Sequence, residues 1–589
     1  MSVSGVNGSA VGQAGSEQDG HDQPGATMAG QQTSTKGFEL IAQALAEAGV
    51  ECIFGVLGDD TGPLIVATSA RGIRYIYVRH ENQAVSMADG YSRSTGRIGV
   101  VTVTGGPGFS NAITAINSAH RGKSRICVLV GTGNVAEDDL DPGTIRSTPP
   151  ASWLKFFPQT AVLDTLGIPW VKPETVDMAW KQTHLAMHMA AQAAVVLVLP
   201  RDVLEGSTNR AIKAIPDLPA ALALQAPTPV QVNALADLLQ ETWAINRPMI
   251  LAGRGALEAQ AAPALKRLGE LTGAVMATTL HANALFHGDP FNLGICGTYA
   301  SPVASELIPQ TDCVLVFGAG LNSLTTYKNT LFPKAMIIQV DTDPAAFGRF
   351  VDVEMGIEAD TRLTAEALVA ELERRDHQAE GFRTDDVRQL IAGFKASDGV
   401  QDKSGGGLLD PRMLMIELDR MLPPERILCA DGGQQARFAI RYIRVNKERN
   451  FLQASDAGSI GLGMGLAIGT AVARPGERVM AAIGDASMMM ALGDLETAVR
   501  LRLPILVVIS NDEALGSEVN FLSEQGLPVE VALTPSPSFA AIAQSMGAQA
   551  AMVRSLQDLA VVERWLQESS PAPLLLDCRI NPDVRAHFL

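Results

Sequence analysis

The chain has 589 residues, of which 47% are hydrophobic and 19% charged, and its formal net charge is −17. This length predicts about three domains, and the composition is typical of a globular protein with large cores. The negative charge would repel phosphate backbones and anionic lipids, so we expect no binding to nucleic acid or to a membrane. No apolar run approaches the roughly 20 residues that span a bilayer. No secretory signal is recognisable, so the expected location is cytoplasmic.

Three long segments show short apolar strands that alternate with helices. They cover residues 37–205, 230–375 and 409–589. Such alternation predicts a parallel sheet covered by helices on both faces. The predicted fold class is therefore α/β, with three doubly wound parallel-sheet domains. The first and third segments are expected to be two versions of one architecture.

The remaining segments contain few large apolar residues. Residues 1–36 are rich in Gly, Ser and Gln, and we expect them to form a disordered tail because they cannot bury enough surface to offset the entropy of ordering. Residues 206–229 are rich in Pro and Ala. Residues 376–408 are polar and become glycine-rich near their end. Both of these segments are predicted linkers.

Polar clusters follow two consecutive predicted strands in the third unit. Strand 479–483 runs into Gly484-Asp485, and strand 505–510 runs into Asn511-Asp512. Open parallel sheets bind ligands at the carboxyl ends of their strands. Two carboxylates and a backbone carbonyl there would suit Mg²⁺ bound to a diphosphate. A single Gly-Asp is more often a turn and a helix cap, but the second cluster at the next strand end favours the metal site.

These two clusters resemble the signature of thiamine-diphosphate-dependent enzymes, which is Gly-Asp-Gly followed by a segment ending in Asn-Asn. It stands here as GDAS and SNDEALG. Ala486 replaces the third-position glycine, and Asp512 replaces the second asparagine and adds a negative charge. The resemblance implies thiamine diphosphate and Mg²⁺ as cofactors. It also implies that Asp485, Asp512 and the carbonyl of Ala514 hold the metal.

A glutamate in the first unit carries a second match to this family. Glu81 follows the predicted strand 73–78 and opens a helix at residues 81–95. The family has a glutamate here that hydrogen-bonds the aminopyrimidine ring, whose imino form removes the proton from the thiazolium carbon. Alone, Glu81 would be explained as a favourable charge in the first turn of a helix. The glycine-rich stretch TGGPGFSNA that follows favours the catalytic role.

Further positions match the segments that line the cofactor in this family. Ile460 falls where the family places a bulky residue that bends the cofactor into a V shape. The residues that the resemblance places at the pyrimidine end are Gly58, Glu81, Gly105, Gly106, Pro107 and Asn111. Those that it places toward the diphosphate end are Asp431, Gly432, Gly433, Gln434, Gly458, Ile460, Gly484, Asp485, Ala486, Ser487, Asp512, Leu515 and Gly516.

Three histidines are considered as further catalytic residues. His120 lies where relatives often carry an aromatic residue, and His281 and His287 lie on a central stretch that approaches the cofactor in relatives. A lone histidine is more often structural than catalytic. The catalytic candidates besides Glu81 are therefore His287 and His120, and His281 is favoured less.

The order of pyrimidine-binding, central and diphosphate-binding domains resembles the branch that contains acetolactate synthase, benzaldehyde lyase and 2-oxoacid decarboxylases. Acetolactate synthase is the most similar subfamily. Its arginines in the central domain are replaced near Gly320 and Leu324, and its Met and Trp pocket residues are replaced by Ser517, Glu518 and their neighbours. Whether FAD or another nucleotide occupies the central domain is left open. The branch implies a homodimer or homotetramer in which Glu81 of one chain faces the diphosphate site of another.

The function expected from this resemblance is the cleavage or formation of a C–C bond next to a carbonyl. The favoured reaction is decarboxylation of a small 2-oxo acid followed by carboligation. One alternative is a lyase or hydrolase that acts on an acyloin or diketone without decarboxylation. Another is a catalytically altered paralogue that only binds the cofactor, although retention of Glu81 argues against it.

Overall fold

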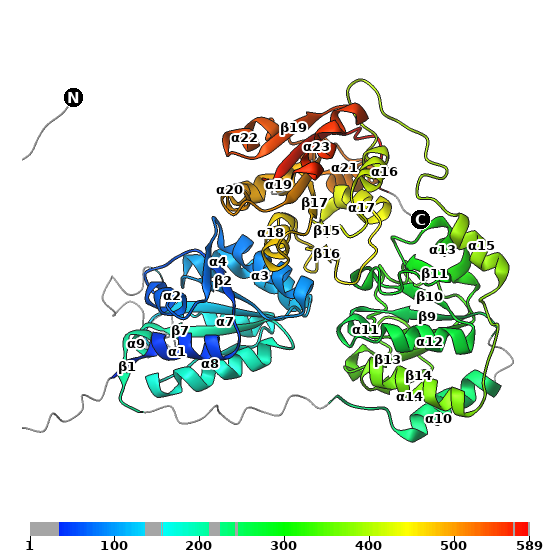
Figure 1. Ribbon diagram of the computed structural model, residues 1–589, viewed down its shortest axis with the longest axis horizontal. Coiled ribbons are helices and arrows are strands. Elements are labelled where there is room, and N and C mark those ends of the chain that lie inside the picture. Colours follow the sequence, from blue (N-terminus) through cyan, green and yellow to red (C-terminus); the bar gives the residue numbers. More distant parts are fainter. Residues whose placement is uncertain are drawn as a thin grey trace, which may run out of the picture.

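The structure is a computed structural model that describes residues 34–135, 155, 157–210, 224–241, 246–568 and 572–586. Within these residues the chain forms three six-stranded sheets, and every strand pairing in them is parallel (Figure 1). Helices cover both faces of each sheet, so the predicted fold class is confirmed. Most of the expected tail, residues 1–33, lies outside the described residues. No helix in the described part of the chain is long and apolar enough to cross a membrane.

The first domain has the strand order β3-β2-β4-β5-β7-β6. Its strands are β2 (Cys52–Gly55), β3 (Arg74–Tyr77), β4 (Gly99–Val103), β5 (Ile126–Thr132), β6 (Trp170–Val171) and β7 (Val195–Pro200). Its helices are α1 (Gly37–Glu47), α2 (Gly62–Ser69), α3 (Glu81–Thr95), α4 (Pro107–Arg121), α7 (Gln159–Leu166), α8 (Val176–Ala190) and α9 (Arg201–Glu205). A separate antiparallel pair joins β1 (Thr35–Lys36) to β8 (Ser207–Thr208).

Alternate residues of these strands enter two different cores, one on each face of the sheet. Ile53 of β2 packs in the cluster that contains residues of α1 and α8. The next residue, Phe54, packs in the cluster that contains residues of α3 and α4. This alternation follows from the period of two along a strand. Because both faces of the sheet are buried, successive residues along a strand such as β2 are apolar, and the strand is a continuous apolar run in the sequence.

The third domain has the strand order β16-β15-β17-β18-β20-β19. Its strands are β15 (Ile427–Ala430), β16 (Phe451–Gln453), β17 (Val479–Gly484), β18 (Ile505–Asn511), β19 (Gln549–Val553) and β20 (Leu574–Arg579). Its helices are α16 (Pro411–Met421), α17 (Gly433–Tyr442), α18 (Gly463–Ala473), α19 (Asp485–Ala491), α20 (Leu495–Arg500), α21 (Gly516–Glu524), α22 (Phe539–Ser545) and α23 (Ala560–Gln567). Strand for strand, this is the order of the first sheet, so the prediction of one shared architecture is confirmed.

The central domain has a different strand order, β11-β10-β9-β12-β13-β14. Its strands are β9 (Pro248–Ala252), β10 (Val275–Thr278), β11 (Asn292–Ile295), β12 (Cys313–Phe317), β13 (Met336–Asp341) and β14 (Met355–Glu358). Its helices are α10 (Pro229–Glu241), α11 (Arg254–Glu258), α12 (Ala262–Thr272), α13 (Pro302–Leu307) and α14 (Thr361–Arg374). The strand order reverses between β9 and β12, as it does in dinucleotide-binding folds.

The connection between the central and third domains is more ordered than a linker. Residues 376–408 include the helix α15 (Asp385–Gly393). Phe382 and Val387 of this segment are buried in a core cluster of the central domain. The segment therefore packs against the central domain before the chain enters the third.

The first and third domains meet through α3 and α18, which occupy the same place in their two sheets (Figure 1). A Cβ atom at Gly90 would lie 2.1 Å from the carbonyl oxygen of Leu466, and one at Gly469 would lie 1.8 Å from that of Met87. Glycine is thus required on both helices for their backbones to approach. One apolar core cluster runs across this contact and joins the two domains.

Candidate active site

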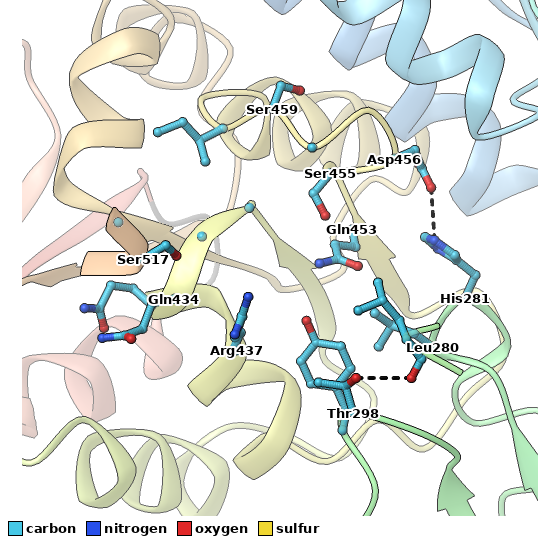
Figure 2. Close-up of a pocket in the computed structure, with 18 of the residues that line it drawn as sticks. Leu280, His281, Thr298, Gln434, Arg437, Gln453, Ser455, Asp456, Ser459 and Ser517 are labelled. Atoms are coloured by element: carbon cyan, nitrogen blue, oxygen red, sulfur yellow. Dashed lines mark hydrogen bonds and ion pairs between the residues drawn. The ribbon is translucent and has the colours of Figure 1, made fainter. Parts of the chain in front are cut away.

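A cavity of about 820 Å³ lies between the third domain and the central domain. It is large enough for a cofactor together with a small substrate. The third domain contributes the turns that follow β15, β17 and β18. The central domain contributes the opposite wall, which includes Leu280, His281 and Thr298 (Figure 2). The cavity therefore lies at the carboxyl ends of two parallel sheets.

Two carboxylates lie together beneath this cavity. Asp485 begins α19 directly after β17, and Asp512 follows the neighbouring strand β18. The Ser536 hydroxyl donates to Asp485 Oδ2 over 2.8 Å, and the Gln435 amide donates to Asp512 Oδ2. Asp512 Oδ1 is buried and has no hydrogen-bond partner among the described residues.

The electrostatics of this pair indicate a missing positive charge. Burial raises the pKa of Asp512, and the charge of Asp485 adds to the effect. Burial also raises the pKa of Asp485. A divalent cation would satisfy the unpaired oxygen and offset both charges. The predicted metal ligands Asp485 and Asp512 therefore fit Mg²⁺, and Ala514, the third predicted ligand, lines the cavity beside them.

Glycines keep the floor of the cavity open. A Cβ atom at Gly516 would lie 2.7 Å from Asp512 Oδ2, and one at Gly432 would lie 2.6 Å from the carbonyl oxygen of Ser459. Gly433 has φ +83°, which other residues rarely adopt. The predicted cofactor-binding residues that line the cavity are Gly432, Gly433, Gln434, Gly458, Ile460, Gly484, Asp485, Ala486, Ser487, Leu515 and Gly516.

Asp431 differs from these neighbours because it points into the protein instead of lining the cavity. It is fully buried. Its Oδ1 accepts from the backbone N–H of Gly432 (2.7 Å), and its Oδ2 accepts from that of Gly461 (3.1 Å). Burial raises the pKa of Asp431 to about 6. The sequence predicted a cofactor contact for Asp431, whereas the structure shows a side chain that ties two cavity turns together.

The predicted pyrimidine-side residues lie together on the first domain. Glu81 is 9% exposed at the start of α3, and its Oε2 accepts from the Asn111 side-chain amide over 3.1 Å. The backbone N–H of Gly105 donates to Asp60 Oδ2 over 2.8 Å, and Gly106 adopts φ +67° before Pro107 opens α4. A Cβ atom at Gly58 would lie 2.5 Å from Thr104. The residues that line the cavity of the same chain do not include Glu81, Asn111 or these glycines.

The structure places the three histidines differently from the prediction. His287 is exposed on the central domain and does not line the cavity, and its backbone carbonyl oxygen accepts from the Lys266 side chain. His120 lies on α4, where burial lowers its pKa, and it does not line the cavity. His281, the least favoured of the three, is the histidine in the cavity wall (Figure 2). Neither predicted catalytic histidine shares this cavity.

His281 belongs to an ionic cluster that joins all three domains. Its Nε2 lies 3.0 Å from Asp456 Oδ1 (Figure 2), and Arg93 of α3 pairs with Asp456 Oδ2. Arg93 also donates to Asp89 over 2.7 Å. Burial opposes ionisation of Asp456, but the charges of Arg93 and His281 hold its pKa well below its usual range. Sequence reasoning missed this cluster because its members are far apart in the chain and match no local motif.

Backbone N–H groups at the carboxyl ends of β9 and β12 are bonded within the chain. The backbone N–H of Gly253 donates to Phe317 O over 2.8 Å, and that of Gly255 donates to Gly318 O over 3.0 Å. A Cβ atom at Gly253 would lie 2.2 Å from Gly318 O. These two amides are already occupied, so they would not be available to the diphosphate of a dinucleotide at this switch point.

Comparison with known proteins gives the class of enzyme. Family models of thiamine pyrophosphate enzymes match the N-terminal TPP-binding domain at residues 35–151, the central domain at 232–368 and the C-terminal TPP-binding domain at 431–578. The three models follow one another in this order and together cover most of the chain. The chain is therefore a thiamine-diphosphate-dependent enzyme, with the cofactor bound by its first and third domains.

Curated relatives define the branch. The chain is 29% identical to a probable acetolactate synthase large subunit of Methanocaldococcus jannaschii, over 93% of this chain and 92% of that protein. It is 26% identical to acetolactate synthase of Mycobacterium bovis, over 93% and 88% of the two chains. It is also 26% identical to the large subunit of the Haemophilus influenzae enzyme, over 94% and 95%. With its three matching domains, the chain belongs to the acetolactate synthase branch of the thiamine-diphosphate-dependent enzymes.

Proposed function

We propose that this enzyme uses thiamine diphosphate and Mg²⁺ to decarboxylate a small 2-oxo acid and to join the remaining fragment to a second carbonyl compound. The observation that carries the proposal is the buried pair Asp485 and Asp512, with an unpartnered Asp512 oxygen beneath an 820 Å³ cavity. The acetolactate synthase names of the relatives support the type of reaction.

The cofactor, when bound, supplies an electron sink for cleavage of a bond next to a carbonyl. In this proposal Asp485, Asp512 and the carbonyl of Ala514 hold Mg²⁺, and the metal binds the diphosphate. The N-terminus of α17, which begins at Gly433, offers backbone N–H groups to the same diphosphate. Ile460 is a bulky apolar residue in the cavity lining, which suits contact with the middle of the cofactor.

Glu81 is the proton-holding group of the proposed mechanism. Its carboxyl is buried, and Asn111 fixes its orientation through the 3.1 Å hydrogen bond. A carboxylic acid held in this way can share its proton with a pyrimidine nitrogen and so favour the imino form of the ring. Substitution of Glu81 would then slow the reaction without removing the diphosphate site.

A homodimer or homotetramer completes the site in this proposal. Glu81 does not line the cavity of its own chain, so a second chain would bring its own Glu81 to that cavity. Exposed apolar side chains on elements next to the cavity support such a contact. Met490 of α19 is 60% exposed, and Phe521 of α21 is 61% exposed. A covering subunit would remove this apolar surface from water.

A lyase or hydrolase that acts on an acyloin or a diketone is the second candidate. Gly320, Leu324 and Ser517 line the cavity where acetolactate synthases carry arginines or large pocket residues. Glu518 adds a carboxylate to the same lining. These lining residues would accommodate an uncharged substrate. Such a substrate has no carboxylate that could leave as CO₂.

The test is CO₂ release from a panel of 2-oxo acids, with thiamine diphosphate and Mg²⁺ present. Turnover of one acid, with a loss of about 10²-fold or more in Glu81→Gln, supports the proposal. The exposed Glu306→Gln on α13 is the matched control and should keep full activity. If no 2-oxo acid is consumed but an acyloin or diketone is cleaved, the second candidate replaces the first. Cofactor binding with no turnover of either class would identify a binding paralogue.

A further inference from the structure

We propose that Arg254 and Arg437 form an anion subsite in the cavity, which binds a carboxylate that the substrate carries in addition to its reacting carbonyl. The inference rests on the proposed function, because it assigns a substrate class to the same cavity. That class is a 2-oxo acid with a second carboxylate, or a carboxylate-bearing acceptor.

Arg254 is the first residue of α11 and enters the cavity from the central domain. Its side chain makes no hydrogen bond or ion pair with any residue in the described part of the chain. Burial lowers the pKa of Arg254 to about 10, and the positive charge of Arg93 adds to this effect, whereas the charges of Asp456, Asp89 and Glu258 oppose it. The side chain is only partly buried, and it lines the cavity, so its donors can face a ligand there.

The carboxylates near Arg254 are already paired with other cations. Asp456 accepts from His281 and Arg93. Glu258, on the same short helix as Arg254, pairs with Arg449 at 3.0 Å and with Arg125 at 2.9 Å. Arg254 therefore remains available to a ligand.

Arg437 enters the same cavity from the third domain. It lies on α17, and Figure 2 shows its side chain in the cavity between Gln434 and Thr298. Like Arg254, it bonds to no described residue. Arg441, one turn further along the helix, instead donates to the backbone carbonyls of Tyr299 and Ala300. The two guanidinium groups thus come from the two domains that enclose the cavity.

Paired arginines are the rule elsewhere in this acidic chain, including at buried positions. Arg93 pairs with Asp89 and Asp456, and Arg426, whose side chain is 3% exposed, pairs with Asp419. Among the described arginines that are not exposed, only those at 254 and 437 lack a hydrogen-bond or ion-pair partner, and both line one cavity. A carboxylate matches the forked donors of a guanidinium better than any neutral polar group does.

A phosphate is a poorer candidate for this subsite. The diphosphate of the cofactor belongs with Gly433 and Asp485 on the floor of the third domain, whereas Arg254 lies on the central-domain wall. A nucleotide diphosphate would need the amides between β9 and β12, and those of Gly253 and Gly255 are occupied. A substrate carboxylate is the remaining anion of suitable size.

The test is calorimetric titration of glutarate into the enzyme loaded with thiamine diphosphate and Mg²⁺. Glutarate has two carboxylates and no oxo group, so its binding does not depend on turnover. Arg254→Gln and Arg437→Gln should each weaken glutarate binding by at least about tenfold, since hydrogen bonds to charged groups contribute this much. Arg254→Lys should keep part of the affinity. Neutral glutaramide should bind all variants alike.

Arg388→Gln is the matched control, because Arg388 is exposed on α15 and pairs with Asp385 on the surface. It should bind glutarate as the wild type does. We expect Arg437→Gln to fold normally, because the Arg437 side chain makes no bond to a described residue. A loss of glutarate binding in this variant would therefore not be caused by misfolding. The proposal would be overturned if the wild-type enzyme does not bind glutarate, or if the variants bind glutarate as tightly as the wild type does. Loss of ADP binding in Arg254→Gln, with glutarate binding unchanged, would assign the arginine to a phosphate and also overturn it. Failure of the proposed function would show instead as an absence of 2-oxo acid turnover.

Discussion

Arg93 of the first domain and Asp456 of the third domain form an ion pair in which each side chain is only 10% exposed. Their pairing also fixes His281, because the second oxygen of Asp456 contacts its ring at 3.0 Å. One carboxylate thereby connects α3, the cavity wall of the central domain and the segment after β16. This single side chain therefore contributes a contact to all three domains.

Asp456→Asn should destabilise the enzyme by about 1–3 kcal/mol, because it removes one of the two carboxylates that pair with the buried Arg93. Chemical denaturation followed by tryptophan fluorescence measures this free energy of unfolding. Asp385→Asn is the control, since Asp385 is 80% exposed and pairs with Arg388 at the surface. It should change stability by less than about 1 kcal/mol. Equal effects of the two substitutions would contradict a role for the cluster in domain assembly.

Gly469→Ala should destabilise the contact between α3 and α18 by about 1–3 kcal/mol. The added methyl group would lie 1.8 Å from the carbonyl oxygen of Met87, so the helices would have to separate. Gly393→Ala, at the end of α15, has no atom within 4 Å of the added group. That control should be neutral or slightly stabilising. Thermal unfolding of the three proteins gives the comparison, and a stable Gly469→Ala would show that this contact is looser than the structure indicates.

Asp431 should make the stability of the protein depend on pH. Its pKa is raised by burial to about 6, so the folded state favours the protonated form. Stability from this group is fully present below the unfolded pKa of about 4, and it is lost as pH rises through 6, by up to about 3 kcal/mol. Asp431→Asn should remove this loss. Unfolding free energies of both proteins between pH 4 and pH 7 measure it, and parallel curves would show that Asp431 does not titrate in this range.

The two metal ligands should respond differently to substitution by asparagine. Asp485→Asn should weaken Mg²⁺-dependent binding of thiamine diphosphate by about tenfold or more, because it removes a charged ligand. Asp512→Asn should weaken it less, since an amide oxygen can still bind the metal and the repulsion from Asp485 disappears. Without metal, Asp512→Asn should also be the more stable protein. Calorimetric titration of the cofactor at fixed Mg²⁺ compares them, with the exposed Asp352→Asn as control. A larger loss in Asp512→Asn than in Asp485→Asn would reverse this assignment.

Local sequence patterns were sufficient to predict the sheets and the pair of strand ends that carry Asp485 and Asp512. Both features depend on apolar runs and on polar residues directly after them, which are visible along the chain. The role of Asp431 was not visible, because the same Asp-Gly-Gly turn can present its carboxylate to a ligand or to backbone amides. The sequence placed His281 on a stretch that approaches the cofactor, but its pairing with Asp456 was hidden, since the packing of separate domains brings the two side chains together. Helix α15 was missed because few of its residues are buried.

The contact between α3 and α18 is self-complementary. The same difference in residue number separates Met87 from Leu466 and Gly90 from Gly469. Gly90 of α3 contacts Leu466 of α18, and in the equivalent way Gly469 of α18 contacts Met87 of α3. This is the pattern of an isologous two-fold interface, found here within a single polypeptide. In a symmetric dimer every substitution at such an interface occurs twice, whereas here each helix can be changed alone. The two halves of this interface can therefore diverge separately, one around Glu81 and the other around the floor of the cavity.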